Sequence, residues 1–329
     1  MKKILKLYSQ LNKILMIKLF DSFAGYGGAH YALEKAKIKF KAVGFSENDP
    51  YASKLYELNH PSVKNFGDIT KINPRDLPDF NFFTGGFPCQ PFSSAGLGGG
   101  EDDTRGTLFH DVLRICEYKK PEHILLENVK GLITKRHKGT LSTIKNKLRQ
   151  LNYFVHVELL NSKYFGIPQN RERVWIYARK NKNFPLNYAL ASEDDKITPI
   201  PHIKNFLDKK PDKDLYRTQK QIDRLIEIHK VDFNVEDYCC LDIYNKKIRT
   251  DGISITITEP HHNTLRIVEP PHNGKFLVRK LSMTENFRLM GFQDGQIDFG
   301  GQSYQQICKR AGNGWDINIA SIIMKNIFK

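Results

Sequence analysis

Residues 17–36 read IKLFDSFAGYGGAHYALEKA, and this stretch decides the fold. Its apolar start, Ile17–Phe20, predicts a short buried strand, the glycines within 25–28 predict a turn, and Ala29–Ala36 predicts a helix. Further strands are predicted at 42–46, 81–85, 123–127, 155–160 and 173–178, and further helices at 50–58, 107–118 and 141–151. Strands that alternate with helices over about 160 residues indicate an α/β fold with a mostly parallel sheet.

The pattern changes after Arg179, where a stretch rich in Asn, Asp, Lys and Pro begins. Beyond it the sequence predicts helices at 218–229, 284–290 and 317–328, and short strands at 253–257, 265–268 and 276–278. We therefore predict a helical extension at 1–15, a large domain at 16–180 completed by 301–329, and a second, smaller domain at 181–300. Met16 is an alternative start to Met1, because the first strand begins directly after it.

The composition restricts the class of protein. The 329 residues are 40% hydrophobic, which is enough for a sizeable core. A net charge of +15, concentrated in residues 1–180, favours a polyanionic partner. A lysine-rich composition typical of AT-rich genomes is the alternative explanation. The five cysteines show no zinc spacing, so we expect a reduced, cytoplasmic protein with no metal site. A run of about 18 apolar residues, which a membrane span needs, does not occur.

A second informative stretch is 84–93, TGGFPCQPFS, which places Cys89 just past the predicted strand at 81–85. A cysteine thiolate is a soft nucleophile that can add to a ring carbon and later be eliminated. The thiolate must be accessible and stabilised by positive charge or a helix terminus. A lone cysteine is more often a small buried hydrophobic residue, but the flanking residues argue against that here. The Gly-rich stretch at 96–105 predicts a loop.

Four segments occur in a fixed order: DSFAGYGG at 21–28, GFPCQPFS at 86–93, ENV at 127–129 and QNRER at 169–173. Together they resemble the DNA (cytosine-5) methyltransferases in their small bacterial or phage form, as found in restriction–modification systems. The resemblance covers nearly the whole chain, except residues 1–15 and much of 181–250. It implies a Rossmann-like large domain that binds S-adenosylmethionine (AdoMet) and a small target-recognition domain.

The same resemblance implies the substrate and the partners. The substrate would be double-stranded DNA, from which the target cytosine must be flipped out before its ring can react. A cognate restriction endonuclease would act in the same self-protection system, and the methyltransferase would be a monomer. The target DNA sequence cannot be read from the chain.

The resemblance assigns AdoMet contacts mostly to the first third of the chain. Glu47, which ends the second predicted strand, would accept both ribose hydroxyls, and Asp68 would accept from the adenine amino group. The implied set is Phe23, Gly25, Gly27, Glu47, Asp68, Ile69, Leu108 and Asn313. Asn48 and Gly314 depart from the commoner family pattern. Taken alone, the glycines would be an ordinary turn and the carboxylates ordinary solvated loop residues.

The resemblance also assigns the chemistry. Cys89 would add to carbon 6 of cytosine, while Glu127, at the end of a buried strand, would donate to ring nitrogen 3 as a neutral acid. Arg173 would bind the cytosine carbonyl oxygen, and Arg171, on the same face of a strand, would anchor Glu127 or a phosphate. Asn128 would hold this segment. DNA contacts are implied for Gln90, Ser93, Arg105 and Thr256. Solvated charges are the ordinary alternative for each charged residue.

Two rival functions remain beside this one. tRNA cytosine methyltransferases share these motifs, and only the long insert before Arg279 favours DNA over RNA. A DNA-binding module without catalysis is the second rival, and the combination of Cys89, Glu127 and the two arginines argues against it. An NAD oxidoreductase is disfavoured because residues 21–28 lack the G-x-G-x-x-G pattern.

Overall fold

The computed structural model describes residues 16–88, 108–134, 138–230, 235–272 and 275–329. The predicted extension at 1–15, the predicted loop at 96–105 and the site residues Cys89, Gln90, Ser93 and Arg105 lie outside these ranges. The chain divides into two compact units. The large unit comprises the described residues up to Leu160, Arg173–Leu190 and Ala320–Lys329, and the small unit comprises Asn161–Glu172 and Ala191–Ile319.

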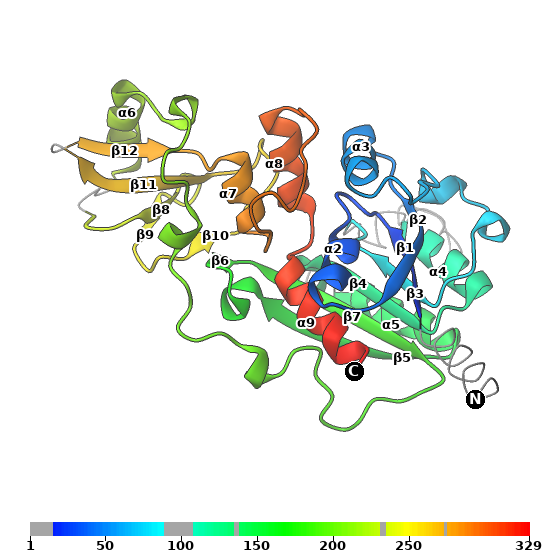
Figure 1. Ribbon diagram of the computed structural model, residues 1–329. Helices are drawn as coiled ribbons and strands as arrows, with labels where there is room; N and C mark the ends of the chain where they lie inside the picture. The colour runs from blue at the N-terminus through cyan, green and yellow to red at the C-terminus, as the bar shows by residue number, and fades with distance from the viewer. Residues whose placement is uncertain (1–15, 89–107, 135–137, 231–234, 273–274) are drawn as a thin grey trace, which may run out of the picture. The chain divides into compact units, whose positions relative to one another are not determined.

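The main sheet has six strands in the order β2-β1-β3-β4-β7-β5 (Figure 1). The strands are β1 Ile17–Ser22, β2 Phe40–Ser46, β3 Phe82–Gly85, β4 His123–Val129, β5 Tyr153–Asn161 and β7 Glu172–Lys180. β1 pairs in parallel with β2 and β3, β3 pairs in parallel with β4, and β4 pairs antiparallel with β7. The predicted mostly parallel α/β sheet is confirmed. Because the carboxyl ends of the parallel strands share one edge, the loops after β1, β2, β3 and β4 meet there.

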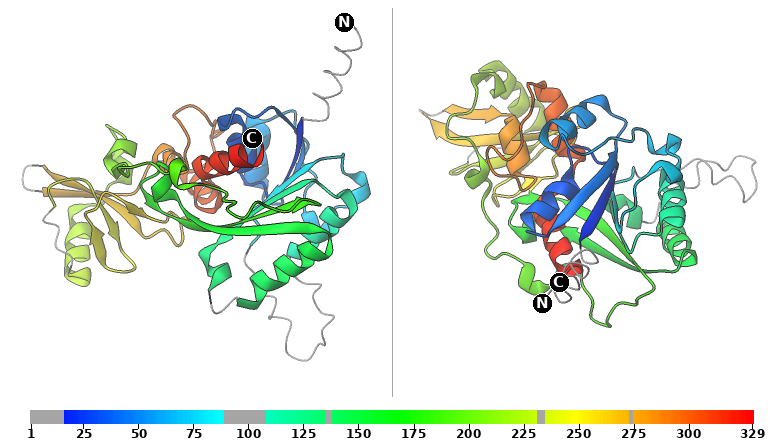
Figure 2. Two further views of the ribbon diagram at one scale, coloured as in Figure 1. Left: turned by 90° about the horizontal axis from the view of Figure 1, so that it is seen from below. Right: turned by 45° about the vertical axis from the view of Figure 1, so that its right-hand side comes forward.

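Helices cover both faces of this sheet. They are α2 Gly28–Lys35, α3 Pro50–Asn59, α4 Leu108–Lys119 and α5 Lys138–Gln150. α4 and α5 pack on one face, where Val112, Cys116, Ile144 and Leu148 join the buried cluster of Phe20, Phe83, Ile124 and Leu126. Figure 2 shows α2 and the last part of the chain on the other face. There Phe328 lies edge-on to Phe82, with ring centroids 5.0 Å apart.

The small unit contains a four-stranded antiparallel sheet in the order β12-β11-β8-β9. Its strands are β8 Cys239–Asp242, β9 Lys247–Arg249, β11 Leu265–His272 and β12 Lys275–Arg279. Helix α6, Gln219–His229, buries Ile222 and Leu225 against Leu241, Val268 and Val278 of the sheet. A short parallel pair joins β6, Gln169–Asn170, to β10, Ser254–Ile255. The strands β8 and β9 were not predicted.

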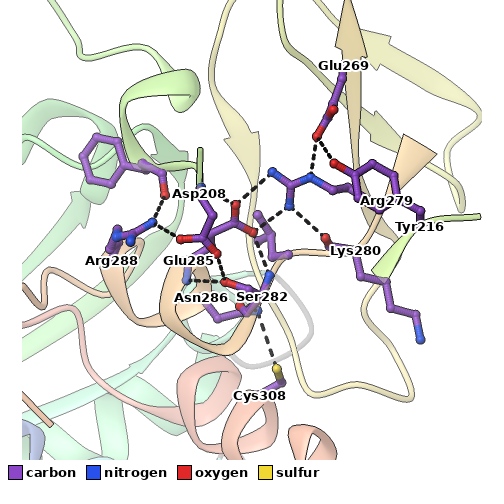
Figure 3. Close-up of polar contacts among 12 residues, drawn as sticks. Asp208, Tyr216, Glu269, Arg279, Lys280, Ser282, Glu285, Asn286, Arg288 and Cys308 are labelled. Atoms are coloured by element: carbon purple, nitrogen blue, oxygen red, sulfur yellow. Dashed lines mark hydrogen bonds and ion pairs between the residues drawn. The ribbon is translucent and has the colours of Figure 1, made fainter. Parts of the chain in front are cut away.

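A buried charge network ties β12 to the following helix α7, Met283–Arg288 (Figure 3). The guanidinium of Arg279 and the carboxylate of Glu285 are fully buried and form two parallel bonds of 2.7 and 2.8 Å. Arg279 Nε donates to Glu269 at 2.6 Å, and Glu285 also accepts from the backbone N–H groups of Asp208 and Ser282. Buried charges are tolerated only when paired and fully hydrogen-bonded, and these charges are.

Two helices end the chain: α8, Tyr304–Asn313, and α9, Ile317–Ile327. The second was predicted, whereas α8 was not. Gly312, near the end of α8, lies so close to the backbone of Thr258 that a Cβ there would collide with it. A glycine is therefore required for this close approach. Among the described residues no helix is both long and apolar enough to cross a membrane.

Candidate active site

The turn between β1 and α2 is held against the end of β2. Gly25 and Gly27 have φ of +56° and +92°, which glycine adopts at no steric cost. Phe23 also has a positive φ, +51°, which is uncommon outside glycine and is found at functional sites. The backbone N–H of Gly25 donates to Oε2 of Glu47 at 2.9 Å. The structure therefore brings the predicted cofactor residues Phe23, Gly25, Gly27 and Glu47 together.

Glu47 is held by hydrogen bonds from two backbone N–H groups. Its Oε1 accepts from the N–H of Asp49 at 2.8 Å, and its Oε2 accepts from Gly25. Asp49 in turn caps α3 by accepting from the N–H groups of Tyr51 and Ala52. Each carboxylate oxygen has a second lone pair, so Glu47 can still accept hydroxyl donors.

Asn65 forms hydrogen bonds with the backbone of Glu47 and was not predicted as a site residue. Its Oδ1 accepts from the N–H groups of Glu47, at 3.2 Å, and Gly67, at 2.8 Å. Its Nδ2 donates to the carbonyl of Glu47 at 3.0 Å and to Oγ of Ser53 at 2.7 Å. An asparagine two residues before a glycine is typical of a turn, but its contact with Glu47 is visible only in three dimensions.

Asp68 and Ile69 lie at the start of a short 3₁₀ helix, Ile69–Lys71. Asp68 Oδ1 accepts from the N–H of Thr70 at 3.0 Å and from its hydroxyl at 2.9 Å, and these bonds lower the pKa of Asp68. Arg114 of α4 donates to the carbonyl of Ile69 at 2.9 Å. Ile69 and Leu108, the first residue of α4, both pack on the core of the large unit.

Asp21, at the end of β1, is a buried carboxyl group that sequence reasoning did not single out as a site residue. Its Oδ1 accepts from the hydroxyl of Thr84 on β3 at 2.7 Å, whereas its Oδ2 is buried with no hydrogen-bond partner in the described part of the chain. Burial, helped by the nearby charge of Glu47 and opposed by the Thr84 bond, raises the pKa of Asp21 to about 7. Asp21 is therefore protonated over much of the acidic range.

We expect Asp21→Asn to remove a pH dependence of stability. An unfolded aspartate ionises near pH 4, but folded Asp21 holds its proton to about pH 7, so rising pH favours the unfolded wild type across this window. From pH 5 to pH 8 the unfolding free energy of the wild type should fall, relative to the variant, by on the order of 2 kcal/mol. Urea unfolding at each pH measures this. Asp76→Asn, at an exposed position, is the control, and parallel curves for the wild type and Asp21→Asn would refute the expectation.

Glu127 and Arg173 form an ion pair at the end of β4. Arg173 Nε lies 2.8 Å from Glu127 Oε1, and both side chains are at least 85% buried. The two residues come from adjacent antiparallel strands, where Val129 of β4 is the register partner of Arg173 of β7. Next to Glu127, Asn128 Nδ2 donates to the carbonyl of Phe87 at 2.9 Å. The Glu127 segment is thereby tied to the chain two residues before Cys89.

The predicted role of Arg171, to anchor Glu127 or a phosphate, stays a prediction. The buried guanidinium of Arg171 donates to the backbone carbonyls of Ile257, Gly312 and Gly314, all within the small unit. The strand alternation assumed for residues 169–173 fails because β6 ends at Asn170 and β7 begins at Glu172. Arg173 makes a contact with Glu127, and Arg171 stabilises the backbone of the small unit.

The remaining predicted residues of the small unit occupy separate places. Thr256 donates from its hydroxyl to the carbonyl of Asn170 at 2.7 Å, beside the β6–β10 pair. Gln169 bonds to the backbone of Ile257 and Leu289. Asn313 is exposed at the end of α8. Contacts of Thr256 with DNA and of Asn313 with AdoMet stay predictions.

Comparison with known proteins gives one consistent result. The family model described as C-5 cytosine-specific DNA methylase matches residues 17–329. The chain is 35% identical over 309 residues to the type II methyltransferase M.HaeII of Haemophilus aegyptius, covering 93% of this chain and 91% of that protein. It is 32% identical over 328 residues to M.HhaI of Haemophilus parahaemolyticus, with 94% of each chain covered.

Solved structures share the fold at lower identity. A structure of a Spodoptera frugiperda DNMT2 variant matches with a TM-score of 0.73 and 20% identity, covering 95% of this chain and 100% of that one. A structure of the S. pombe Dnmt2 methyltransferase matches with a TM-score of 0.71 and 22% identity, covering 94% and 97%. At this identity the likeness establishes the arrangement of strands and helices.

Proposed function

The chain belongs to the C-5 cytosine-specific DNA methylase family, and from this premise we propose which of its residues carry out the reaction. The protein is a DNA (cytosine-5-)-methyltransferase that uses AdoMet as methyl donor. The observation that carries the residue assignment is the Glu127–Arg173 ion pair, which Asn128 links to the segment leading into Cys89.

The residues after β1 and β2 fit AdoMet. At Gly25 a Cβ would meet nothing within 4 Å, so there is space beside this turn, and the Glu47 carboxylate beside it can accept hydroxyl donors. We assign the ribose to Glu47, the adenine to Asp68, Ile69 and Phe23, and the amino-acid end to Gly25 and Gly27. When bound, AdoMet supplies an electrophilic methyl group.

The proposed reaction begins at the target cytosine. The Cys89 thiolate forms a bond to carbon 6, while Glu127, as a neutral acid, donates its proton to nitrogen 3 so that negative charge does not build up on the ring. Arg173 orients Glu127 through their ion pair, and it would also bind the ring carbonyl oxygen. The resulting enamine makes carbon 5 nucleophilic, and AdoMet held by Glu47, Gly25 and Gly27 would supply the methyl group and be left as S-adenosylhomocysteine. A base then removes the carbon-5 proton, the Cys89 sulfur leaves as the ring double bond re-forms, and the proton on nitrogen 3 returns to the Glu127 carboxylate.

We propose a sequence-specific type II enzyme, as its relatives are named, acting as a monomer in the cytoplasm beside a cognate restriction endonuclease. Residues 181–300 would read the target, and Gln90, Ser93, Arg105 and Thr256 would contact the DNA. Much of the affinity would come from phosphate contacts, since the chain carries a net charge of +15.

The direct test uses purified protein, radiolabelled AdoMet and two substrates, plasmid DNA and tRNA. Bisulfite sequencing of the plasmid should show methylated cytosines within one short recurring sequence. Incorporation into tRNA alone would transfer the assignment to RNA, and incorporation into neither would support a non-catalytic DNA-binding protein.

Asn65→Ala should weaken AdoMet binding about tenfold, because Asn65 bonds both the N–H and the carbonyl of Glu47. The residue itself need not touch the cofactor; it positions Glu47. Calorimetric titration with AdoMet measures the dissociation constant. Asn73→Ala, which removes an exposed cap of another short helix, is the matched control. An unchanged dissociation constant in Asn65→Ala would contradict the assignment of Glu47.

A further inference from the structure

Two histidines and a glutamate gather beside the proposed cofactor loop and have no part in the proposed reaction. His30 and Glu34 are one turn apart on α2, and His60 directly follows α3. One nitrogen or oxygen from each residue lies within 4.8 Å of those of the other two. The histidines are each 8% exposed, and Glu34 opens the cluster to solvent. We propose that His30, Glu34 and His60 bind a divalent cation of the zinc class.

The hydrogen bonding of His30 suits a ligand. Its Nδ1 lies 3.2 Å from the hydroxyl of buried Tyr56, which can accept the ring proton, and a metal-binding histidine usually makes such a bond with its other nitrogen. Nε2 then presents a lone pair 3.5 Å from Oε1 of Glu34. Two electron-pair donors at this distance repel unless a proton or a cation lies between them.

His60 supplies the second, independent observation. Its Nε2 is buried and has no hydrogen-bond partner among the described residues, which is costly for a polar atom. Burial lowers the pKa of His60 to about 4, so its imidazole is neutral and available as a donor. Two imidazoles and one carboxylate are a donor set that zinc accepts, leaving a fourth position for water.

The imidazole rings of His30 and His60 must change their relative orientation before both can bind one cation. His30 and His60 are stacked, with centroids 3.6 Å apart and 14° between their planes. A cation lies in the plane of each imidazole that binds it, so one ring has to turn. His60 is the ring that turns, because no hydrogen bond to Nε2 holds it, whereas Tyr56 holds His30. Without an ion, the competing arrangement has Nδ1 of His30 accepting from the Tyr56 hydroxyl and its Nε2–H directed at Glu34.

A bound ion would brace the proposed AdoMet site without entering it. α2 begins directly after the Gly25–Gly27 turn, and α3 begins at Pro50, next to the Asp49 N–H that holds Glu47. Linking His30 on α2 to His60 after α3 would therefore join the two helices that follow the cofactor-binding loops. The predicted consequence is structural: stabilisation of the large unit, independent of methyl transfer.

The test uses the full-length protein without a purification tag, stripped with a chelator and titrated with Co²⁺ and Zn²⁺. We expect one equivalent of Co²⁺ to give visible absorption bands and Zn²⁺ to raise the melting temperature by several degrees. Glu34→Gln, at an exposed position, should weaken binding at least tenfold, and His60→Ala should abolish it. His156→Ala is the control, since His156 and Glu158 form a comparable pair, 3.2 Å apart, with no third ligand in the part of the chain that the structure describes.

The outcomes separate the two arrangements. No saturable binding, or equal binding by the wild type, Glu34→Gln and His60→Ala, would overturn the proposal in favour of the direct contact between His30 and Glu34. If His60→Ala fails to fold, Glu34→Gln decides alone, because its side chain is 46% exposed and its amide keeps the shape. Loss of binding in His156→Ala as well would mean that the cation binds elsewhere.

Discussion

Cys89→Ser should abolish methyl transfer while DNA binding persists. The proposed reaction needs a group that is ionised near neutral pH, attacks a ring carbon and later leaves, and a serine hydroxyl stays protonated there and is a weaker nucleophile and a poorer leaving group. We expect kcat/KM to fall by roughly 10³-fold or more, as is usual when a covalent nucleophile is removed. Incorporation of label from AdoMet into plasmid DNA measures the loss, and fluorescence anisotropy with duplex DNA measures binding.

Two comparisons make this result specific. Cys239→Ser is the matched control, because its Sγ already donates to the carbonyl of Asp237 at 3.2 Å and a hydroxyl can replace that bond. DNA that carries fluorine in place of the carbon-5 hydrogen of cytosine should trap the wild-type enzyme covalently. A base cannot remove this fluorine as it removes the proton, so the bond between Cys89 and carbon 6 cannot be broken. Substantial activity of Cys89→Ser, or trapping that survives this substitution, would remove Cys89 from the mechanism.

The strands and helices of the large unit could be predicted because each is specified by residues that are close together in the sequence. The run 17–36 contains a strand, a glycine turn and a helix, and the structure has β1 at Ile17–Ser22 and α2 at Gly28–Lys35. The small sheet could not be predicted as well. Cys239–Asp242 is only four residues long and is buried throughout, so it has no alternation to detect. It is a strand because it pairs with Leu265–Val268, which is a tertiary effect.

The candidate site likewise contains residues that could be predicted from local sequence and residues that only tertiary contacts reveal. Glu47 and the glycines belong to segments with recognisable patterns, whereas Asn65 acts through contacts with a residue 18 positions away. Helix α8 had a usable signal, since Ser303 caps it and Ile307 and Ala311 are one turn apart and buried. Gly312 lies within this helix, at a place where the backbone of Thr258 leaves no room for a side chain.

Glu127→Gln should lower kcat by roughly 10²- to 10³-fold, the size expected for the loss of an acid catalyst. Glutamine keeps the shape and can still donate a hydrogen bond, but it cannot deliver a proton to ring nitrogen 3 as the sulfur adds to carbon 6. The dissociation constants for DNA and AdoMet should hardly change. Glu122→Gln, at an exposed carboxylate beside the start of β4, is the matched control.

Substitution of Arg173 tests whether Glu127 acts as an acid in catalysis or only as an ion-pair partner. Arg173→Lys keeps the positive charge but loses the planar fork that holds Oε1 at 2.8 Å. If Arg173 orients Glu127 for catalysis, Arg173→Lys should lower kcat, and adding it to Glu127→Gln should cost little more, because both act on one step. If the pair only stabilises the sheet, melting temperatures should fall while kcat stays constant. Full additivity in kcat would assign Arg173 a role of its own, at the cytosine carbonyl oxygen.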